Sequence, residues 1–255
     1  MPPPRTYRAE SLVLKSIPLG EADLLVTLFT REAGKVRAVG KGARRPTAKL
    51  VGHLEPVTAA RLHLSRGRSL DVINQAETLN SFRSLKTNLT AITRGLQVCE
   101  LVDGFGSEAS PNEPLYDLAQ ATLSAIGRAP EDEFPLLHFQ LHLLNVSGLM
   151  PELQYCVGCR GNIEPDRHRY SLDGGGIFCP DCLPDQAGLR PLSLRALKVL
   201  RLLSRSSPSE LPSLHLDAAL SQELKSILTG TLQYWLDREI RTNSFLNQLA
   251  RADRG

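Results

Sequence analysis

Short apolar segments separated by turn residues characterise the first eighty residues of the chain. Five of these segments are rich in Val, Leu and Ile and lie at residues 11–17, 23–29, 35–39, 57–64 and 70–76. The sequences Glu32-Ala33-Gly34 and Arg66-Gly67-Arg68 are typical of tight turns that join such strands into hairpins. Five strands in this length predict a small closed β-barrel of the oligonucleotide-binding (OB) type. An SH3-like barrel fits the same pattern almost as well.

From residue 81 the spacing of apolar residues becomes that of helices. Apolar residues recur at intervals of four, three and four in the series Leu85, Leu89, Ile92 and Leu96. This spacing predicts one apolar face of a helix that ends near Gly104. Similar patterns predict helices at about 113–126, 131–147, 193–204 and 221–241. The predicted fold class is therefore multidomain α+β, with an OB domain at 1–80 and a helical domain at 81–255.

Between two of these helices, four cysteines form two pairs with the spacing C-x2-C: Cys156, Cys159, Cys179 and Cys182. Each pair sits on a tight turn that aims two thiolates at one point, so two facing turns form a tetrahedral sulfur cage suited to zinc. We expect a zinc-binding module at 151–184, inserted into the helical domain and holding one ion. Four thiolates leave no open coordination position, so the metal should be structural.

Two disulfides are the alternative interpretation of the same four cysteines. No apolar secretion signal follows the start Met1-Pro2-Pro3-Pro4-Arg5, and a cytosolic setting would keep the thiols reduced. No run of about 18 apolar residues predicts a membrane span. We therefore expect a cytoplasmic protein that contains zinc and does not contact a membrane. The fifth cysteine, Cys99, falls within a helical pattern and is expected in the core.

Charge is distributed unevenly along the chain. Residues 1–70 contain 13 Lys or Arg against 5 Asp or Glu, a net charge of +8 in a chain whose total is +3. The remainder therefore carries −5. A basic N-terminal unit joined to a mildly acidic remainder indicates a polyanionic partner at one end of the molecule.

The densest basic run extends from Arg31 to Lys49 and contains a single acid, Glu32. Its candidate DNA-binding residues are Lys35, Arg37, Lys41, Arg44, Arg45 and Lys49. Loops of this kind border the nucleic-acid groove of OB barrels, although many charge runs are only solvated surface. Residues 1–80 offer only Tyr7 and Phe29 as large aromatic rings near such a groove, so binding should be mostly to phosphates.

Motifs for enzymatic chemistry are missing from the sequence. Gly34-Lys35 is followed by Val36, where a phosphate-binding loop needs Ser or Thr. His138 and His142 are spaced as in a zinc protease, but Phe139 occupies the position of its glutamate, so helix-packing or surface roles are favoured. We expect neither a catalytic residue nor a small-molecule substrate. A zinc hydrolase would require an open metal site.

Several N-terminal segments resemble the bacterial RecO family. They are SLVLK at 11–15, GEADLLVTLFTREAGK at 20–35, KGARR at 41–45 and LEP at 54–56, and TNSFL at 242–246 resembles the family's closing region. Ala48 and Val57 depart from the family, which often has Ser and an aromatic residue at these positions. The basic positions that match the family's motif are Lys35, Lys41, Arg44 and Arg45, whereas Arg37 and Lys49 are candidates on charge alone.

The resemblance implies a recombination mediator in the bacterial cytoplasm, associated with the nucleoid. Family members bind single- and double-stranded DNA, anneal complementary strands, associate with RecR and help to load RecA onto DNA covered by single-strand-binding protein (SSB). The expected partners are thus DNA, RecR and the C-terminal tail of SSB. The alternative function is an RNA-binding protein of translation or RNA processing, because OB barrels and zinc modules serve both polymers.

Overall fold

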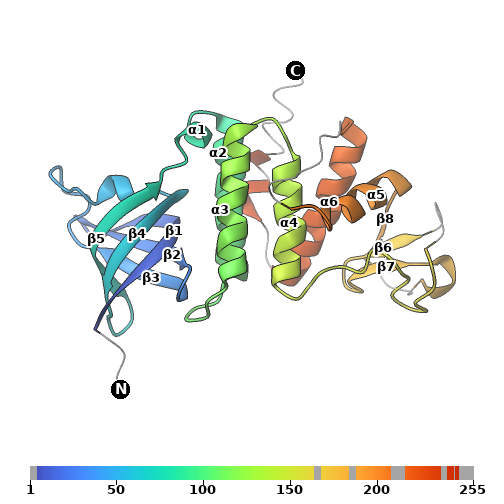
Figure 1. The fold of residues 1–255 in the computed structure, drawn as a ribbon, viewed down its shortest axis with the longest axis horizontal. Coiled ribbons are helices and arrows are strands. Elements are labelled where there is room, and N and C mark those ends of the chain that lie inside the picture. The colour runs from blue at the N-terminus through green and yellow to red at the C-terminus, as the bar shows by residue number, and fades with distance from the viewer. Residues whose placement is uncertain are drawn as a thin grey trace. The chain divides into compact units, whose positions relative to one another are not determined.

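The computed structural model describes residues 5–163, 168–183, 188–207, 216–236, 240–243 and 245–246. Contacts divide the chain into two compact units (Figure 1). The first comprises Met1–Glu131 with Arg241–Gly255, and the second comprises Asp132–Ile240. This division does not test the predicted domain boundary at residue 80 or the predicted inserted module at 151–184. Both therefore stay predictions.

Five strands of the first unit close into a barrel in the order β1-β2-β3-β5-β4 (Figure 1). They are β1 (Thr6–Leu19), β2 (Asp23–Thr30), β3 (Gly34–Gly40), β4 (Thr58–Ser65) and β5 (Asp71–Asn80), with the 3-10 turn η1 (Val51–His53) before β4. Strands β3 and β5 pair in parallel, and the other neighbours are antiparallel. This arrangement confirms the predicted OB-type fold.

Strand β1 is longer than predicted because it serves two partners. Its residues from Thr6 to Val13 pair with β4, and those from Ser11 onward pair with β2. The register with β2 shifts between Val13 and Lys15, as at a β-bulge, where the strand passes from one neighbour to the other. Both edges of the sheet are thereby paired, which closes the barrel.

Side chains of β2 alternate between the inside and the outside of the barrel. Leu24, Val26 and Leu28 are buried in the barrel core. The residues that alternate with them, Asp23, Leu25 and Thr27, are half-buried. This period of two is what a strand with one side in the core requires.

Three helices follow the barrel in the chain: α1 (Arg83–Lys86), α2 (Leu89–Phe105) and α3 (Glu113–Arg128). The side chains of Asn88 and Asn112 cap α2 and α3 by accepting a hydrogen bond from the backbone N–H of the third residue of each helix. Glu113 and Pro114 occupy the first turn of α3, where an acid and a proline are both favourable.

The predicted apolar face of α2 is wrong. Leu85 belongs to α1, and the side chains of Leu89 and Leu96 are exposed, at 58% and 37%. A second series with the same four-three-four spacing, Ala91, Gly95, Val98 and Val102, is buried instead. These smaller residues allow a closer approach of neighbouring elements than the leucines would, and the break before Asn88 removes Leu85 from the register of α2.

Helix α2 packs on the outside of β1 and β2. The ring of Phe29 is fully buried, and a Cβ atom at Gly106 would lie 2.8 Å from it. The thiol of Cys99 lies 3.8 Å from the carbonyl oxygen of Val13 and is buried, which confirms its predicted place in the core. Burial raises the pKa of this thiol to about 12.

The described residues of the second unit form three α-helices and a small sheet. The helices are α4 (Phe134–Val146), α5 (Leu194–Leu203) and α6 (Ala218–Leu236), and the strands are β6 (Arg169–Ser171), β7 (Gly176–Phe178) and β8 (Leu189–Pro191), with the 3-10 turn η2 (Pro180–Cys182). The sheet order is β7-β6-β8. Ser193 caps α5, as its position suggests. No helix of the described residues combines the length and apolar character that crossing a membrane requires.

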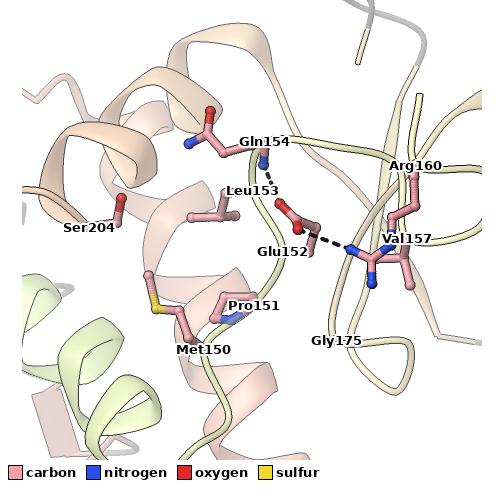
Figure 2. A pocket seen from close by; sticks show the side chains of 9 residues that line it. All are labelled: Met150, Pro151, Glu152, Leu153, Gln154, Val157, Arg160, Gly175 and Ser204. Carbon is pink, nitrogen blue, oxygen red and sulfur yellow. Dashed lines mark hydrogen bonds and ion pairs between the residues drawn. The ribbon is translucent and has the colours of Figure 1, made fainter. Parts of the chain in front are cut away.

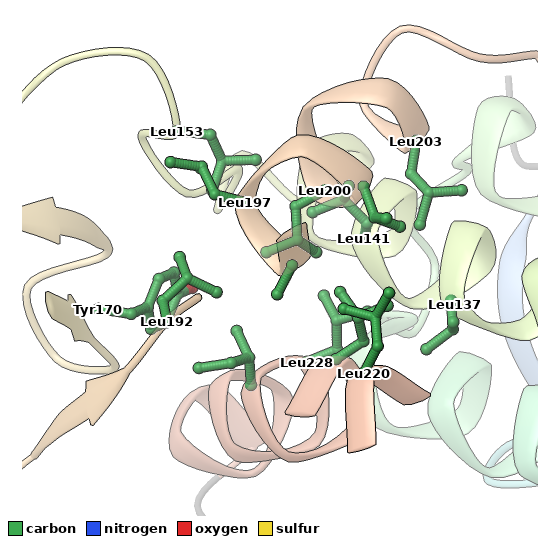
Figure 3. Packing of buried hydrophobic residues seen from close by; sticks show 14 of the residues in the cluster. Leu137, Leu141, Leu153, Tyr170, Leu192, Leu197, Leu200, Leu203, Leu220 and Leu228 are labelled. Carbon is green, nitrogen blue, oxygen red and sulfur yellow. The ribbon is translucent and has the colours of Figure 1, made fainter. Parts of the chain in front are cut away.

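One apolar core joins the helices and the small sheet of this unit (Figure 3). Leu141, Leu200 and Leu228 supply it from the three helices, and Tyr170 and Ile177 supply it from β6 and β7. The hydroxyl of Tyr170 also pairs with that of Thr231 at 3.0 Å. The residues around the four cysteines therefore pack in the same apolar core as the helices.

Two histidines of α4 bind the C-terminal end of α5. The rings of His138 and His142 stack with their centroids 4.1 Å apart. With the proton on Nε2, His138 donates to the carbonyl oxygen of Ser206 and His142 to that of Leu203, each at 3.0 Å. These carbonyl oxygens lie in the last turn of α5 and just after it, where no N–H group of the helix is available to donate to them. The predicted helix-packing role is confirmed.

We expect His138 to make the second unit sensitive to acid. Burial lowers the pKa of His138 from 6.5 to about 4, and the neighbouring His142 adds to the shift although the hydrogen bond to Ser206 opposes it. The folded state thus prefers neutral His138, and the unfolded state takes up the proton first. The free energy of unfolding should be intact above pH 6.5 and should fall by up to about 3 kcal/mol as the pH approaches 4.

Urea unfolding at several pH values, compared between the wild type and His138→Gln, measures this effect. Glutamine keeps a donor for Ser206 but does not titrate, and all other titrating groups are common to both proteins. The variant should therefore lose less stability below pH 6.5 than the wild type. Parallel stability curves would show that His138 is protonated as easily in the folded chain as in the unfolded one.

Candidate nucleic-acid interface and metal centre

The basic loop, residues 41–49, follows β3 and is held by backbone contacts. The N–H of Gly42 donates to Oδ1 of Asp23 at 2.7 Å, and the N–H of Arg44 donates to the carbonyl of Ala22 at 2.8 Å. Gly42 has a φ of +64°, a left-handed conformation that favours glycine. Ala43 is buried in the barrel core. The loop is therefore fixed to the turn between β1 and β2.

Four cations of the basic loop point into solvent. Lys41, Arg44, Arg45 and Lys49 are all exposed. Arg44 donates to the carbonyl oxygens of Gly20 and Glu21 at 3.1 and 3.3 Å, which orients its guanidinium without neutralising it. Within the described ranges, none of the four forms an ion pair. Their charges therefore remain available to an anion in solution.

The two candidate residues on β3 differ in their surroundings. Arg37 is exposed and has no ion pair within the described residues. Lys35 is half-buried, and its Nζ donates to the carbonyl oxygen of Asp103 at 2.7 Å and lies 3.5 Å from Oδ1 of the same residue. Lys35 thus joins the barrel to α2, a contact that its sequence neighbours do not signal.

Arg31 has a similar connecting role at the start of the basic run. Its guanidinium lies 3.5 Å from Glu113 and 2.9 Å from Asp117, both on α3. The same guanidinium lies over the ring of Tyr116 at 5.9 Å. The basic run therefore divides into cations that are engaged by helices, Arg31 and Lys35, and cations that are free of acidic partners in the described residues.

The four cysteines meet as the sequence predicts. Their sulfur atoms all lie within 4.8 Å of one another, and those of Cys159 and Cys179 are 3.8 Å apart. A tetrahedral site with Zn–S bonds of about 2.3 Å would have sulfur–sulfur edges of about 3.8 Å. The cluster is therefore of the size that a tetrathiolate metal site requires, and the described cysteines form no disulfide.

Local backbone geometry places these sulfur atoms. The N–H of Cys156 donates to the carbonyl of Gly161 and the N–H of Arg160 donates to that of Cys156, both at 2.9 Å, which closes the first turn. A Cβ atom at Gly158 would lie 2.8 Å from Cβ of Cys182, so only glycine lets the two turns approach. Strands β6 and β7 form the hairpin that carries Cys179 to the first turn.

Backbone N–H groups favour the thiolate form of Cys156. Burial raises its pKa, but the N–H groups of Cys179, Cys159 and Gly158 together outweigh that effect and lower the value to about 6. The N–H of Cys179 lies 3.3 Å from this sulfur. A soft cation such as zinc prefers sulfur in this ionised form.

A pocket of about 520 Å³ lies beside the first cysteine turn (Figure 2). Met150, Pro151 and Leu153 provide its apolar surface. Its two charged groups, Glu152 and Arg160, pair with each other at 3.3 Å. The Glu152 carboxylate also accepts from the N–H groups of Gln154 and Tyr155 at 2.8 and 3.2 Å. The pocket offers no unpaired charge, and no sequence signal singles it out.

Two family models together match nearly the whole chain. The model described as "Recombination protein O N terminal" matches residues 4–82, and the model described as "Recombination protein O C terminal" matches residues 86–244. The first of these spans the barrel, and the second spans the helices and the four cysteines.

Curated relatives agree with these models over their full length. The DNA repair protein RecO of Desulforudis audaxviator is 34% identical over 248 residues, which is 96% of this chain and 98% of the relative. That of Desulforamulus reducens is 31% identical over 251 residues, 98% of each chain. That of Dehalococcoides mccartyi strain 195 is 29% identical over 253 residues, 99% of this chain and all of the relative.

Lys35 should contribute to stability in a way that Arg37 does not. Replacing Lys35 by Met keeps the apolar stem but leaves Asp103 without its cation and its carbonyl without a donor. We expect a loss of about 1 kcal/mol in the free energy of unfolding. The control Arg37→Met, on the same strand, should stay within about 0.5 kcal/mol of the wild type. Urea unfolding measures both, and equal losses would contradict the division between engaged and free cations.

Proposed function

Because the chain belongs to the RecO family of DNA repair proteins, we propose that it binds DNA phosphates through the basic loop and Arg37 and acts as a recombination mediator. The proposal rests above all on one observation: exposed cations without acidic partners in the described residues gather at the end of β3 and in the loop after it. Such one-signed clusters attract polyanions and bind them by releasing counterions.

The barrel's aromatic residues favour binding to the backbone of DNA. Phe29 is fully buried beneath α2, so it cannot stack on a base. The hydroxyl of Tyr7 donates to Asp71 at 2.5 Å, and Arg66 covers its ring at 4.6 Å from the centroid. A surface that binds phosphates and leaves bases free can hold one strand while its bases pair with another. This property supports the proposal that the protein anneals complementary strands.

We propose that Cys156, Cys159, Cys179 and Cys182 hold one structural zinc ion. Bound zinc would neutralise the thiolates and link the two turns, and a closed set of four ligands leaves no position for water. The cysteine turns contribute Leu153, Tyr170 and Ile177 to the core of the second unit, so the ion would also support that core. The proposed role is to stabilise the fold, and no catalytic step is assigned to any residue.

The proposed partners follow from the family. They are single- and double-stranded DNA, RecR and the acidic tail of SSB, with RecA as the protein whose loading is assisted on SSB-covered DNA. The place of action would be the bacterial cytoplasm at the nucleoid. An acidic tail needs unpaired cations beside apolar surface. The pocket beside the first cysteine turn does not meet this need, because Arg160 is paired with Glu152.

Strand annealing tests the proposed function most directly. Two complementary oligonucleotides covered by SSB are mixed with the protein and no nucleotide triphosphate, and duplex formation is followed by fluorescence. The proposal predicts annealing that requires the protein. A folded protein that leaves both strands single would contradict it, and stronger binding to RNA than to DNA of equal sequence would favour the RNA-binding alternative.

Removing three loop cations should weaken DNA binding through its electrostatic part. For Lys41→Ala/Arg44→Ala/Arg45→Ala, we expect the slope of log affinity against log salt to fall by roughly 0.7 per lost single-strand contact, about 2 in all. The loss should be similar for many sequences. The charge-matched control is Arg8→Ala/Arg83→Ala/Arg128→Ala, three exposed residues outside the loop. Equal slopes for the two triple variants would remove the loop from the DNA site.

Metal content should depend on the four clustered cysteines and not on the fifth. The purified wild type should contain one zinc ion per chain, and Cys159→Ser/Cys182→Ser should lose it, because two thiolates cannot form the closed site. The matched control Cys99→Ala should keep its zinc. Elemental analysis gives the content, and thermal unfolding should show a lower Tm for the double variant. A wild type that is folded, reduced and free of metal would contradict the zinc proposal.

A further inference from the structure

Two peptide groups lead into the first cysteine turn, and a charged side chain binds each of them from either side. They join Leu153 to Gln154 and Gln154 to Tyr155, directly before Cys156. Their carbonyl oxygens accept hydrogen bonds from Arg201 on α5, at 2.6 Å from Nε and at 3.3 Å from Nη2. The guanidinium is a planar, rigid fork of donors, so it fixes the two carbonyl groups relative to each other.

Glu152 binds the other side of the same two peptide groups. Its Oε1 accepts from the N–H groups of Gln154 and Tyr155 at 2.8 and 3.2 Å. Its Oε2 lies 3.3 Å from the guanidinium of Arg160, the residue after Cys159. Figure 2 shows this carboxylate between Gln154 and Arg160. One carboxylate therefore binds the chain both before and after the first pair of cysteines.

Backbone contacts with β7 hold the two ends of this segment. The N–H of Glu152 donates to the carbonyl of Gly175 at 2.9 Å, and its own carbonyl accepts from the N–H of Ile177 at 3.1 Å. Beyond Cys156, the N–H of Val157 donates to the carbonyl of Ile177 at 2.8 Å. Between these contacts lie residues 153–155, which we call the lead-in segment and which bind the two charged side chains.

Arg201 reaches the lead-in segment from a helix end that is itself fixed. It lies in the last turn of α5, where Leu200 and Leu203 are buried in the core of the second unit. The carbonyl oxygens of Leu203 and Ser206 are bound by the two histidines of α4. Arg201 is half-buried and stands 48 positions from Leu153 in the chain. Its contacts therefore join the first cysteine turn to the helices.

We infer that Arg201 and Glu152 are positioning residues of the metal site, which hold the lead-in segment so that the sulfur of Cys156 meets the other three. The inference rests on the proposed zinc ion and extends it from the four ligands to the residues that orient them. Assembling four thiolates costs conformational entropy, and hydrogen bonds that order the backbone in advance reduce this cost. Contacts outside the ligand set influence the affinity of metal sites for this reason.

The coupling acts in both directions. If the contacts of Arg201 favour binding of the ion, the bound ion must favour these contacts by the same factor. Zinc would then stabilise the C-terminal end of α5 as well as the two cysteine turns. The metal site would thus be linked to the helical core through one side chain.

The first test measures zinc affinity of the reduced full chain by competition with a chromophoric chelator. Arg201→Met keeps the aliphatic stem and removes the donors, so zinc binding should weaken by about 10-fold. The control Lys198→Met removes an exposed cation from the same helix and should stay within about 2-fold of the wild type. Arg201→Lys keeps the charge without the fork and should fall between them. Equal affinities of Arg201→Met and Lys198→Met would overturn the inference.

Glu152→Gln tests the other side of the lead-in segment without altering α5. Glutamine keeps an acceptor oxygen but loses the charge that binds Arg160 and strengthens the hydrogen bonds from the two N–H groups. Zinc affinity should fall several-fold. This variant also gives an answer if Arg201→Met does not fold. An affinity equal to that of the wild type would exclude Glu152 from the positioning role.

Urea unfolding with and without zinc distinguishes positioning from general stabilisation. If Arg201 stabilised the zinc-bound and zinc-free chains equally, its substitution would leave zinc affinity unchanged. The inference predicts that Arg201→Met loses more stability in the zinc-bound protein than in the zinc-free one, by about 1.4 kcal/mol for a 10-fold change in affinity. Equal losses in the two forms would contradict it.

The outcomes separate this inference from the zinc proposal. A folded, reduced wild type that binds no zinc would contradict the zinc proposal and the inference together. A wild type that binds one zinc ion, but no more tightly than Arg201→Met and Glu152→Gln do, leaves the zinc site standing and excludes the positioning role.

Discussion

The packing of helix α2 against the outside of the barrel determines what the basic N-terminal region can do. The close approach at Gly106 seats the helix on Phe29, and Asp103 binds Lys35 at the border of the contact. Neighbouring cations of the basic run therefore differ in their partners. Lys35 and Arg31 are engaged by helices, whereas Arg37 and the cations of the basic loop face solvent. The same helix buries the ring of Phe29, so this residue is not available to stack on a base.

The four cysteines impose a second constraint, on the other unit. A short three-stranded sheet buries too little apolar surface to be stable alone. Here it is supported from two sides, by the cysteine cluster and by the core that Tyr170 and Ile177 share with the helices. Thiolates gathered this closely repel one another unless a cation compensates them. The geometry of the cluster, with a separation of 3.8 Å between two of its sulfurs, matches the need of a tetrahedral metal ion.

Local patterns predicted much of this structure. The strands, their hairpins and the cysteine turns follow from short apolar segments, turn residues and cysteine spacing, because each depends on neighbours in the sequence. The buried face of α2 did not follow, because the series through Leu89 and the series through Ala91 have the same spacing. Only packing against elements from elsewhere in the chain, such as Leu85 and Val57 around Gly95, selects the smaller residues.

The basic loop of the candidate site could likewise be predicted from the sequence. The basic loop is dense in charge, and the structure shows its cations exposed. The engagement of Lys35 by Asp103 joins residues 68 positions apart, which no window of sequence reveals. The pairing of the exposed Lys15 with Thr27, and of Thr27 with Arg37, likewise depends on strand register across a bulge and not on neighbours in the sequence.

Hydrogen exchange of the full chain with and without a single-stranded oligonucleotide measures where DNA binds without altering any residue. The account predicts slower exchange in the basic loop and around Arg37 on β3. Exchange in α3 and in the segments around the four cysteines should be the same with and without the oligonucleotide. Protection in these segments reflects only the stability of the fold. Protection confined to the second unit, with none in the barrel, would contradict the claim that the barrel's unpaired cations form the DNA site.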